Sequence, residues 1–211
     1  MAGLGIGPDE FALFRIADPD GRADALEGTL LPALAAVAGG LAAGLSRVAG
    51  APLLPYPGRV QRRKGFPPEE VFVAFCATDK GYLRVPFLAL AVTRAHLHAR
   101  VAARSSADRA AALRAALLRE AQNLARKGKP FRKLRSYAGW DYEELPELAP
   151  AHSPAFWKEV AEPLGERNGT SGLDVGVAWS AEEARSLAVG DVLGAFRDLA
   201  SIYKLLANAL K

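Results

Sequence analysis

The 211-residue chain is poor in the residues that build disulfides, thiol active sites and cysteine-rich metal sites. Cys76 is its only cysteine, which excludes an intramolecular disulfide and a cysteine-based metal site. The apolar neighbours of Cys76 predict a buried packing residue in a reducing cytoplasm. They argue against a nucleophilic thiol, because apolar surroundings raise the pKa of a cysteine.

Long hydrophobic runs and a recognisable secretion signal are also absent. No segment approaches the roughly 18 to 20 uninterrupted apolar residues that a membrane helix needs. Residues 1–7 carry no positive charge and no adequate apolar block, so they do not resemble a signal peptide. Half of the residues are apolar and 24% are charged, a composition typical of soluble globular proteins. The sequence therefore predicts a cytoplasmic protein without a membrane partner.

Recognisable catalytic motifs are missing as well. The glycines of residues 3–7 follow no strand, and nothing matches the lysine-containing phosphate loop. No Gly-x-Ser-x-Gly elbow is present. Glu69 and Glu70 follow two prolines, and we identify no second acid that would complete a catalytic pair. The sequence indicates no cofactor and no catalytic residues, and it leaves open whether the protein is an enzyme.

The middle of the chain has the composition of β-strands. Residues 71–75 are rich in β-branched and aromatic side chains, which predicts a buried strand. Residues 82–92 and 96–103 predict two further strands joined by turns, with Pro86 favouring an edge or a bulge. In residues 173–179, large apolar residues alternate with small or polar ones, which predicts a further strand. Together these segments predict antiparallel pairing.

Three segments show helical spacing instead. Residues 26–48 predict a long helix, in which Pro32 causes a kink or break near residues 29–31. Residues 107–127 predict a second helix that Gly128 and Pro130 end. A capping box at Ser180 begins a third, which continues to the end of the chain.

Two shorter segments complete the prediction. Residues 11–16 predict a first strand or docking segment, and residues 51–58 contain three prolines and predict an irregular connection. Helices cluster near the ends of the chain and strands lie in its middle, without regular alternation. This order predicts an α+β fold: one domain spanning residues 1–211, with a mainly antiparallel sheet and helices packed on it.

The charge pattern is the main functional signal. The net charge is +4 and the pI about 9.3, which permits a phosphate-bearing partner without requiring one. The basic residues form two clusters: Arg59, Arg62, Arg63 and Lys64, and then Arg126, Lys127, Lys129, Arg132, Lys133 and Arg135. If they met, they would neutralise several phosphates, with Tyr137 and Trp140 as stacking surfaces. The alternative is a solvated surface, since four acids follow at residues 141–147.

His96 and His98 are spaced to face the same side of a strand, together with Arg94 and Arg100. This His-x-His pattern occurs in metal sites, but the flanking arginines repel a cation and we predict no metal. Two alternatives remain open: a cationic strip that faces an anion, or a solvated polar face on an edge strand.

Several stretches carry the pattern of a known family. Residues 62–75 are similar to Ala-Arg-Arg-x-x-x-Pro-Pro-x-x-x-Trp/Phe-Val-Ala-Phe, and residues 80–82 and 86–87 to Arg-Gly-Tyr-Lys and Pro-His-Phe. His96 lies where this family has a histidine, and the N-terminal pattern is shared at Phe11, Phe14, Ile16, Asp20 and Arg22. The chain thus resembles the YktB-like family of uncharacterised bacterial proteins. The resemblance implies an α+β fold and no established activity.

The chain departs from the family pattern at several positions. Residues 56–58 replace a histidine-containing lead-in, and Leu88 and Leu90 replace more polar residues. His98 stands where the family is usually aromatic. Because one histidine is missing and another is new, these changes weaken any histidine-based mechanism.

The leading hypothesis is a non-catalytic cytoplasmic protein that binds nucleic acid or a small anionic ligand. Its predicted anion-binding residues are Arg59, Arg62, Arg63, Lys64, His96, Arg132, Lys133 and Arg135. One alternative is an enzyme for a small phosphorylated or carboxylated substrate, with Arg62, Arg63 and His96 lining its pocket. Another is a structural or oligomeric interaction module; the oligomeric state is not indicated. A deep pocket favours the enzyme, and a flat basic face favours nucleic acid.

Overall fold

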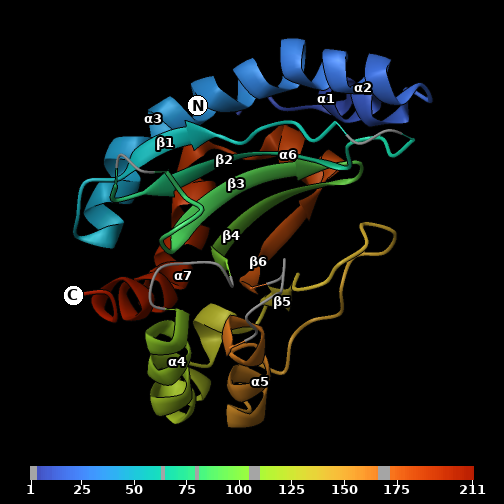
Figure 1. Cartoon of the computed structure of the whole chain (residues 1–211). Helices are drawn as coiled ribbons and strands as arrows, with labels where there is room; N and C mark the ends of the chain where they lie inside the picture. The colour runs from blue at the N-terminus through green and yellow to red at the C-terminus, as the bar shows by residue number, and fades with distance from the viewer. Residues whose placement is uncertain (1–3, 63–64, 79–80, 105–109, 166–171) are drawn as a thin grey trace.

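All strands in the described part of the chain join one antiparallel sheet (Figure 1). The computed structural model describes residues 4–62, 65–78, 81–104, 110–165 and 172–211. The strand order is β1-β2-β3-β4-β6-β5, and every neighbouring pair is antiparallel. The strands are β1 (Leu54–Pro57), β2 (Glu70–Cys76), β3 (Phe87–Thr93), β4 (His96–Arg104), β5 (Arg135–Ser136) and β6 (Gly172–Ser180). The predicted α+β fold with a mainly antiparallel sheet is confirmed.

The helices surround this sheet in two groups. In Figure 1, α1, α2 and α3 lie on one side of the sheet, and α4 and α5 lie together at the opposite end of the molecule. The helices are α1 (Pro8–Ala12), α2 (Pro19–Ala25), α3 (Leu31–Ala49), α4 (Ala110–Ala125), α5 (Pro154–Glu159), α6 (Ala181–Ser186) and α7 (Val189–Asn208). The long helices α3 and α7 pack against each other and against the central strands.

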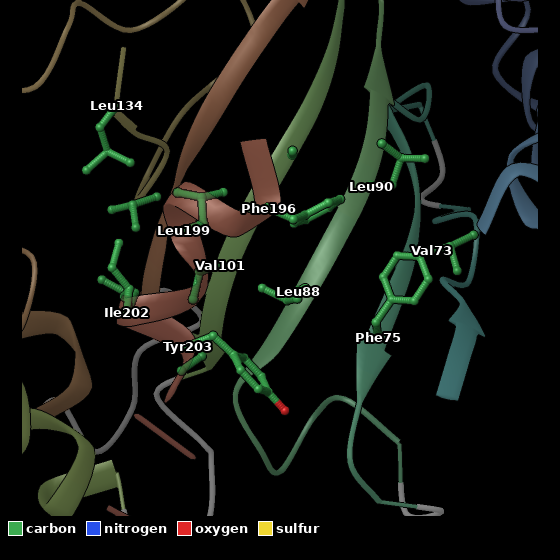
Figure 2. Packing of buried hydrophobic residues seen from close by; sticks show 14 of the residues in the cluster. Val73, Phe75, Leu88, Leu90, Val101, Leu134, Phe196, Leu199, Ile202 and Tyr203 are labelled. Atoms are coloured by element: carbon green, nitrogen blue, oxygen red, sulfur yellow. The ribbon is translucent and has the colours of Figure 1, made fainter. Parts of the chain in front are cut away.

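One face of the sheet, which we call the helix face, forms the main core with α3 and α7. Alternation along β2, β3 and β4 directs every second side chain to this face. Figure 2 shows the strand residues against Phe196 and Leu199 of α7. The rings of Phe75 and Phe196 meet edge to face with centroids 6.3 Å apart. The strand residues of this core are fully buried: Val73, Phe75, Leu88, Leu90 and Val101. The opposite face, which we call the second face, carries the polar residues described below.

The long helical segment 19–49 is continuous but not uniformly α-helical. A π-helical turn, Leu26–Leu30, joins α2 to α3 immediately before Pro32. This confirms the predicted irregularity, because a proline supplies no backbone N–H to the preceding turn. By length and composition alone, this is the one described helix that could cross a membrane, contrary to the expectation from the sequence. Core helices of soluble proteins pass the same test, and Leu34 and Leu45 of this helix are fully buried.

Several local predictions are wrong. Residues 11–15 are helical: α1 continues into a 3₁₀ turn, Leu13–Arg15, that buries Phe14. The proline-rich segment contains β1, which tolerates its prolines because it is an edge strand. Residues 138–172, whose four prolines predict irregular structure, contain α5, which begins at Pro154 after a Ser153 cap. The capping box at Ser180 is confirmed, but the helix that it begins ends at Ser186 and α7 starts anew. Ser105 and Ser106, which the sequence offers as N-caps for the helix predicted over residues 107–127, lie outside the described residues. So do residues 79–80 of the turn predicted at residues 79–81.

Candidate functional site on the second face of the sheet

The second face has room for long polar side chains because small residues flank them. The alternation of β4 directs His98 and Arg100 to this face, as the sequence predicts. Ala91 lies opposite His98 and Ala89 opposite Arg100 on β3, and Gly176 lies opposite Arg100 on β6. A Cβ atom on Gly176 would collide with the backbone of β4 and lie 2.7 Å from the Cγ atom of Arg100. Glycine at this position therefore permits the buried arginine.

Arg100 is the centre of a buried ion-pair cluster that spans three strands. Its guanidinium contacts the carboxylate of Glu70 from β2 and lies 3.3 Å from Asp174 Oδ2 on β6. The side chains of Arg100, Glu70 and Asp174 are only 5%, 14% and 17% exposed. Burial raises the pKa of Asp174, and the nearby Arg100 partly opposes this shift. Such clusters gain little net stability over apolar packing, because desolvation offsets the attraction.

Three aromatic side chains from the segment after β5 lie against this cluster. The Tyr137 ring stands between His98, at a centroid distance of 5.1 Å, and the guanidinium of Arg100, at 5.4 Å from the ring centroid. Trp140 contacts His98 and Tyr137 at centroid distances of 5.4 and 5.3 Å. Tyr142 packs on Trp140 at 4.7 Å. The segment between β5 and α5, the gold loop in Figure 1, thus contributes three rings to the site.

Tyr142 joins this aromatic group to the ion pairs. Its hydroxyl donates a hydrogen bond of 3.0 Å to Glu70 Oε2, and burial raises its pKa. It is the one non-glycine residue with a positive φ, 69°, in the described part of the chain. A bulky residue in this conformation costs about 1–3 kcal/mol and persists only where its contacts impose it. The contacts with Trp140 and Glu70 therefore hold a strained residue at the site.

The hydrogen bonds around His98 define its tautomer. The Oγ1 hydroxyl of Thr93 donates to the His96 carbonyl oxygen at 3.3 Å and lies 3.1 Å from His98 Nε2. Because a hydroxyl has one proton, Nε2 of His98 must be the donor to Thr93. Burial lowers the pKa of His98 to about 3, and His96 and Arg135 reinforce the effect. His98 is therefore neutral near pH 7 and presents a bare lone pair at Nδ1.

Apart from Glu70 Oε1, which is in the ion pair with Arg100, four polar atoms of this site are buried without a partner among the described residues. They are His98 Nδ1, Arg100 Nε, Tyr137 Oη and Asp174 Oδ1. Each such atom costs roughly 1–3 kcal/mol if nothing binds it, so native proteins rarely leave several together. The set is mixed: Arg100 Nε is a donor, the His98 and Asp174 atoms are acceptors, and the tyrosine hydroxyl is either. A bound molecule that pairs with these atoms needs both donors and acceptors.

Two clefts open beside the cluster, on either side of Tyr142. The first, of about 350 Å³, is lined by Arg59, Gln61, Phe66, Pro67, Pro68, Glu69, Glu70, Phe72, Asp141 and Tyr142. The second, of about 640 Å³, is lined by Arg15, Glu69, Arg94, Ala95, Asp141, Tyr142 and Glu143. Glu69 is paired with Arg22 at 2.9 Å, and Glu70 with Arg100. Within the described residues, Arg15, Arg59 and Arg94 form no ion pair, so cationic charge is available at both clefts.

The residues predicted to bind anions are distributed unevenly. Arg59 lines the first cleft. Arg62 instead binds Asp24 and Glu27 at 2.8 and 2.6 Å, and these carboxylates raise its pKa. Arg63 and Lys64 lie outside the described residues.

The remaining predicted residues lie on β4 or close to β5, toward the opposite edge of the sheet from β1. His96 is half-buried with its ring 5.9 Å from that of His98, and burial lowers its pKa. Arg135 donates a hydrogen bond to the carbonyl oxygen of Pro146. Arg132 and Lys133 are exposed before β5. Since β1 and β5 are opposite edges of the sheet, four strands separate the two basic clusters in the strand order.

One interpretation from the sequence is corrected. The solvated edge strand proposed for the histidines is wrong: β4 is central and His98 is fully buried. The structure also shows an acid that the sequence did not connect with Glu70, because Asp174 pairs with the same arginine, Arg100. The sequence signal for Asp174 was a charged residue inside an otherwise apolar strand. No group of three or more histidine, cysteine or acidic residues in the described part of the chain is placed to hold a metal ion.

Comparison with known protein families adds one match. Residues 7–186 match the domain of unknown function DUF1054. The matched range contains the buried cluster, the aromatic segment and both clefts. No curated protein matches the sequence.

Proposed function

The chain belongs to the DUF1054 family, also known as YktB-like, and from the site itself we propose that it binds a small polar molecule carrying an acidic group. The ligand occupies the second face of the sheet, between the clefts beside Tyr142 and the cluster around Arg100. The phosphorylated or carboxylated compounds inferred from the basic sequence fit this description. The single buried cysteine, Cys76, is consistent with a cytoplasmic location.

The observation that carries this proposal is the group of four buried, unpartnered polar atoms. Polar atoms buried for structural reasons alone are normally paired within the protein. Here the pairing is incomplete at four neighbouring residues, whereas the ion pairs beside them are formed. A ligand hydroxyl or amine would donate to His98 Nδ1 and Asp174 Oδ1, and a ligand oxygen would accept from Arg100 Nε.

The acidic group of the ligand is inferred from the clefts. The carboxylates of Glu69 and Glu70 are already paired, while Arg15, Arg59 and Arg94 form no ion pair with any residue that the structure describes. An arginine fork binds carboxylate or phosphate with two parallel hydrogen bonds. Asp141 and Glu143 also line the clefts, so a ligand with an additional amine would be tolerated.

The charge state of His98 limits the chemistry. With a pKa of about 3, His98 is a poor general base near neutral pH, because a useful base has a pKa near the working pH. It serves instead as a fixed hydrogen-bond acceptor. The arrangement therefore supports ligand binding without proton transfer by His98, and binding should be insensitive to its titration between pH 5 and 8.

The test compares two variants, each lacking one buried hydroxyl, by thermal shift and calorimetry against a set of small phosphorylated and carboxylated compounds. Tyr137→Phe removes only an unpartnered hydroxyl, so the protein should fold normally and lose about tenfold in ligand affinity. Ser201→Ala, which removes an unpartnered hydroxyl from α7 on the helix face, is the matched control and should bind as the wild type does. Equal affinity of the Tyr137→Phe and wild-type proteins for every compound that binds would contradict the proposal. So would the absence of binding across the whole set.

A second candidate function is nucleic-acid binding by the exposed cations before β5. Five basic residues there are exposed and form no ion pair with any described residue: Arg126, Lys127, Lys129, Arg132 and Lys133. Binding of short RNA and DNA should then weaken steeply with salt and be lost in an Arg132→Ala/Lys133→Ala variant. An Arg62→Ala/Arg63→Ala/Lys64→Ala variant tests the other cluster. Salt-insensitive binding, or none at low salt, would remove this candidate.

A further inference from the structure

The seam between α3 and α7, on the side of the sheet away from the proposed ligand site, has its own cavities. The two helices are in contact at Gly44, where a Cβ atom would lie 2.8 Å from the Leu193 side chain. A larger residue at this position would force the Leu193 side chain to move. Two neighbouring cavities open along the seam, one cationic and one apolar.

The cationic cavity has a volume of about 380 Å³ and is lined by Gly44, Arg47, Val48, Leu193, Arg197, Ala200 and Lys204. Arg197, Ala200 and Lys204 recur at helical spacing, so they share one face of α7, and Arg47 faces them from α3. Gly44 and Ala200 are buried and small, so they leave space at the bottom of the cavity between the basic side chains. None of the three basic side chains forms an ion pair with a described residue.

The apolar cavity continues from the first one toward the ends of both helices. It has a volume of about 250 Å³ and is lined by Ala49, Gly50, Ala51, Ala77, Thr78, Val85, Pro86, Tyr203, Lys204, Ala207, Asn208, Leu210 and Lys211. Lys204 lines both cavities. Among the described residues that line either one, none is an aspartate or a glutamate. The seam thus presents a cluster of positive charge next to an apolar space.

We propose that this seam binds an amphipathic anion, with its carboxylate or phosphate head among Arg47, Arg197 and Lys204 and its hydrocarbon tail in the apolar cavity. The head forms charge-assisted hydrogen bonds with the cations. The tail removes apolar surface from water, and each buried methylene contributes a similar increment. A small inorganic anion would use only the first cavity, and an uncharged chain only the second.

The experiment varies the head and the tail separately. Calorimetry at constant ionic strength compares butyrate, hexanoate and octanoate, octyl phosphate, 1-octanol and inorganic phosphate, all below their micellar concentrations. Affinity should rise about fourfold for each methylene until the cavity is full. Octanoate and octyl phosphate should bind more tightly than both octanol and inorganic phosphate.

Two variants locate the site. Arg197→Gln/Lys204→Gln changes exposed residues only and should weaken octanoate binding at least tenfold while leaving octanol binding unchanged. Arg119→Gln/Lys158→Gln removes the same charge from α4 and α5 and should bind octanoate as the wild type does. Leu210→Asn should reduce the gain per methylene.

Three results would overturn the proposal. One is equal affinity for inorganic phosphate and octyl phosphate, which would mean that the tail contributes nothing. Another is unchanged octanoate binding in the Arg197→Gln/Lys204→Gln variant. The third is an equal loss in the control variant, which would mean that net charge alone attracts the ligand. The Tyr137→Phe variant, which weakens binding at the second face, should bind octanoate as the wild type does, and this separates the two sites.

Discussion

Replacing Arg100 with methionine tests whether the buried cluster is maintained for stability or for binding. Methionine has a similar length but no charge, so Arg100→Met leaves Glu70 and Asp174 buried without their cation. Removing one partner of a buried ion pair costs about 3–5 kcal/mol. In urea unfolding at pH 7, this corresponds to a midpoint lowered by roughly 1–2 M for a protein of this size.

A triple variant separates the cost of the missing partner from the value of the cluster. Glu70→Gln/Arg100→Met/Asp174→Asn removes all three charges, and it should recover most of the lost stability while binding no ligand at the second face. Arg62→Met is the matched control, because Arg62 also contacts two carboxylates but is exposed. Its unfolding midpoint should change little.

The pH dependence of Arg100→Met provides an independent check. The pKa of Asp174 is already raised by burial, and losing Arg100 raises it further. The folded state then holds the proton more tightly than the unfolded state, so stability increases as the pH falls through the raised pKa toward the ordinary value. The destabilisation should therefore be smaller at pH 4.5 than at pH 7. A cost below about 1 kcal/mol at pH 7, or a triple variant no more stable than the single one, would refute this reasoning.

Three further predictions concern stability. The pKa of His98 is lowered to about 3, so as the pH falls the unfolded state binds a proton on this histidine before the folded state does. The free energy of unfolding therefore decreases as the pH drops below about 6.5. His98→Phe should abolish about 2–3 kcal/mol of this decrease between pH 7 and 4.5, measured by urea unfolding at both pH values. Phe196→Ala should cost about 3–5 kcal/mol at the helix face, and Leu193→Ala less, since Leu193 is only half-buried. Ser180→Ala removes the cap of α6 and should lower stability by about 1 kcal/mol, whereas Ser186→Ala, at the end of the same helix, should change it less.

The fold was predictable where neighbouring segments carry their own signals. Strands β2, β3 and β4 follow one another along the chain and form two successive hairpins. Their apolar residues and the turns between them can therefore be recognised from short stretches of sequence. β1 has no such signal: Pro55 and Pro57 oppose strand formation, and only pairing with β2 at the sheet edge overrides them. The helical conformation of residues 11–15 likewise depends on Phe11 and Phe14 being buried in the core.

The site was predictable only in part, for a similar reason. The spacing of His98 and Arg100 correctly placed both on one side of a strand. Their partners Glu70 and Asp174 come from strands far away in the sequence, so no local pattern connects them. Tyr137 was noted for its position beside basic residues, but its contact with Arg100 depends on the path of the chain after β5.

The strand order also has a consequence for how the protein is made. β4 (His96–Arg104) pairs with β6 (Gly172–Ser180). Between these two strands the chain also forms α4, β5 and α5. During synthesis, the hairpins of β2, β3 and β4 are complete long before β6 leaves the ribosome. The edge of β4 is then unpaired, and apolar strands with bare edges are prone to aggregate. The nascent chain therefore has to remain protected until its last strand arrives.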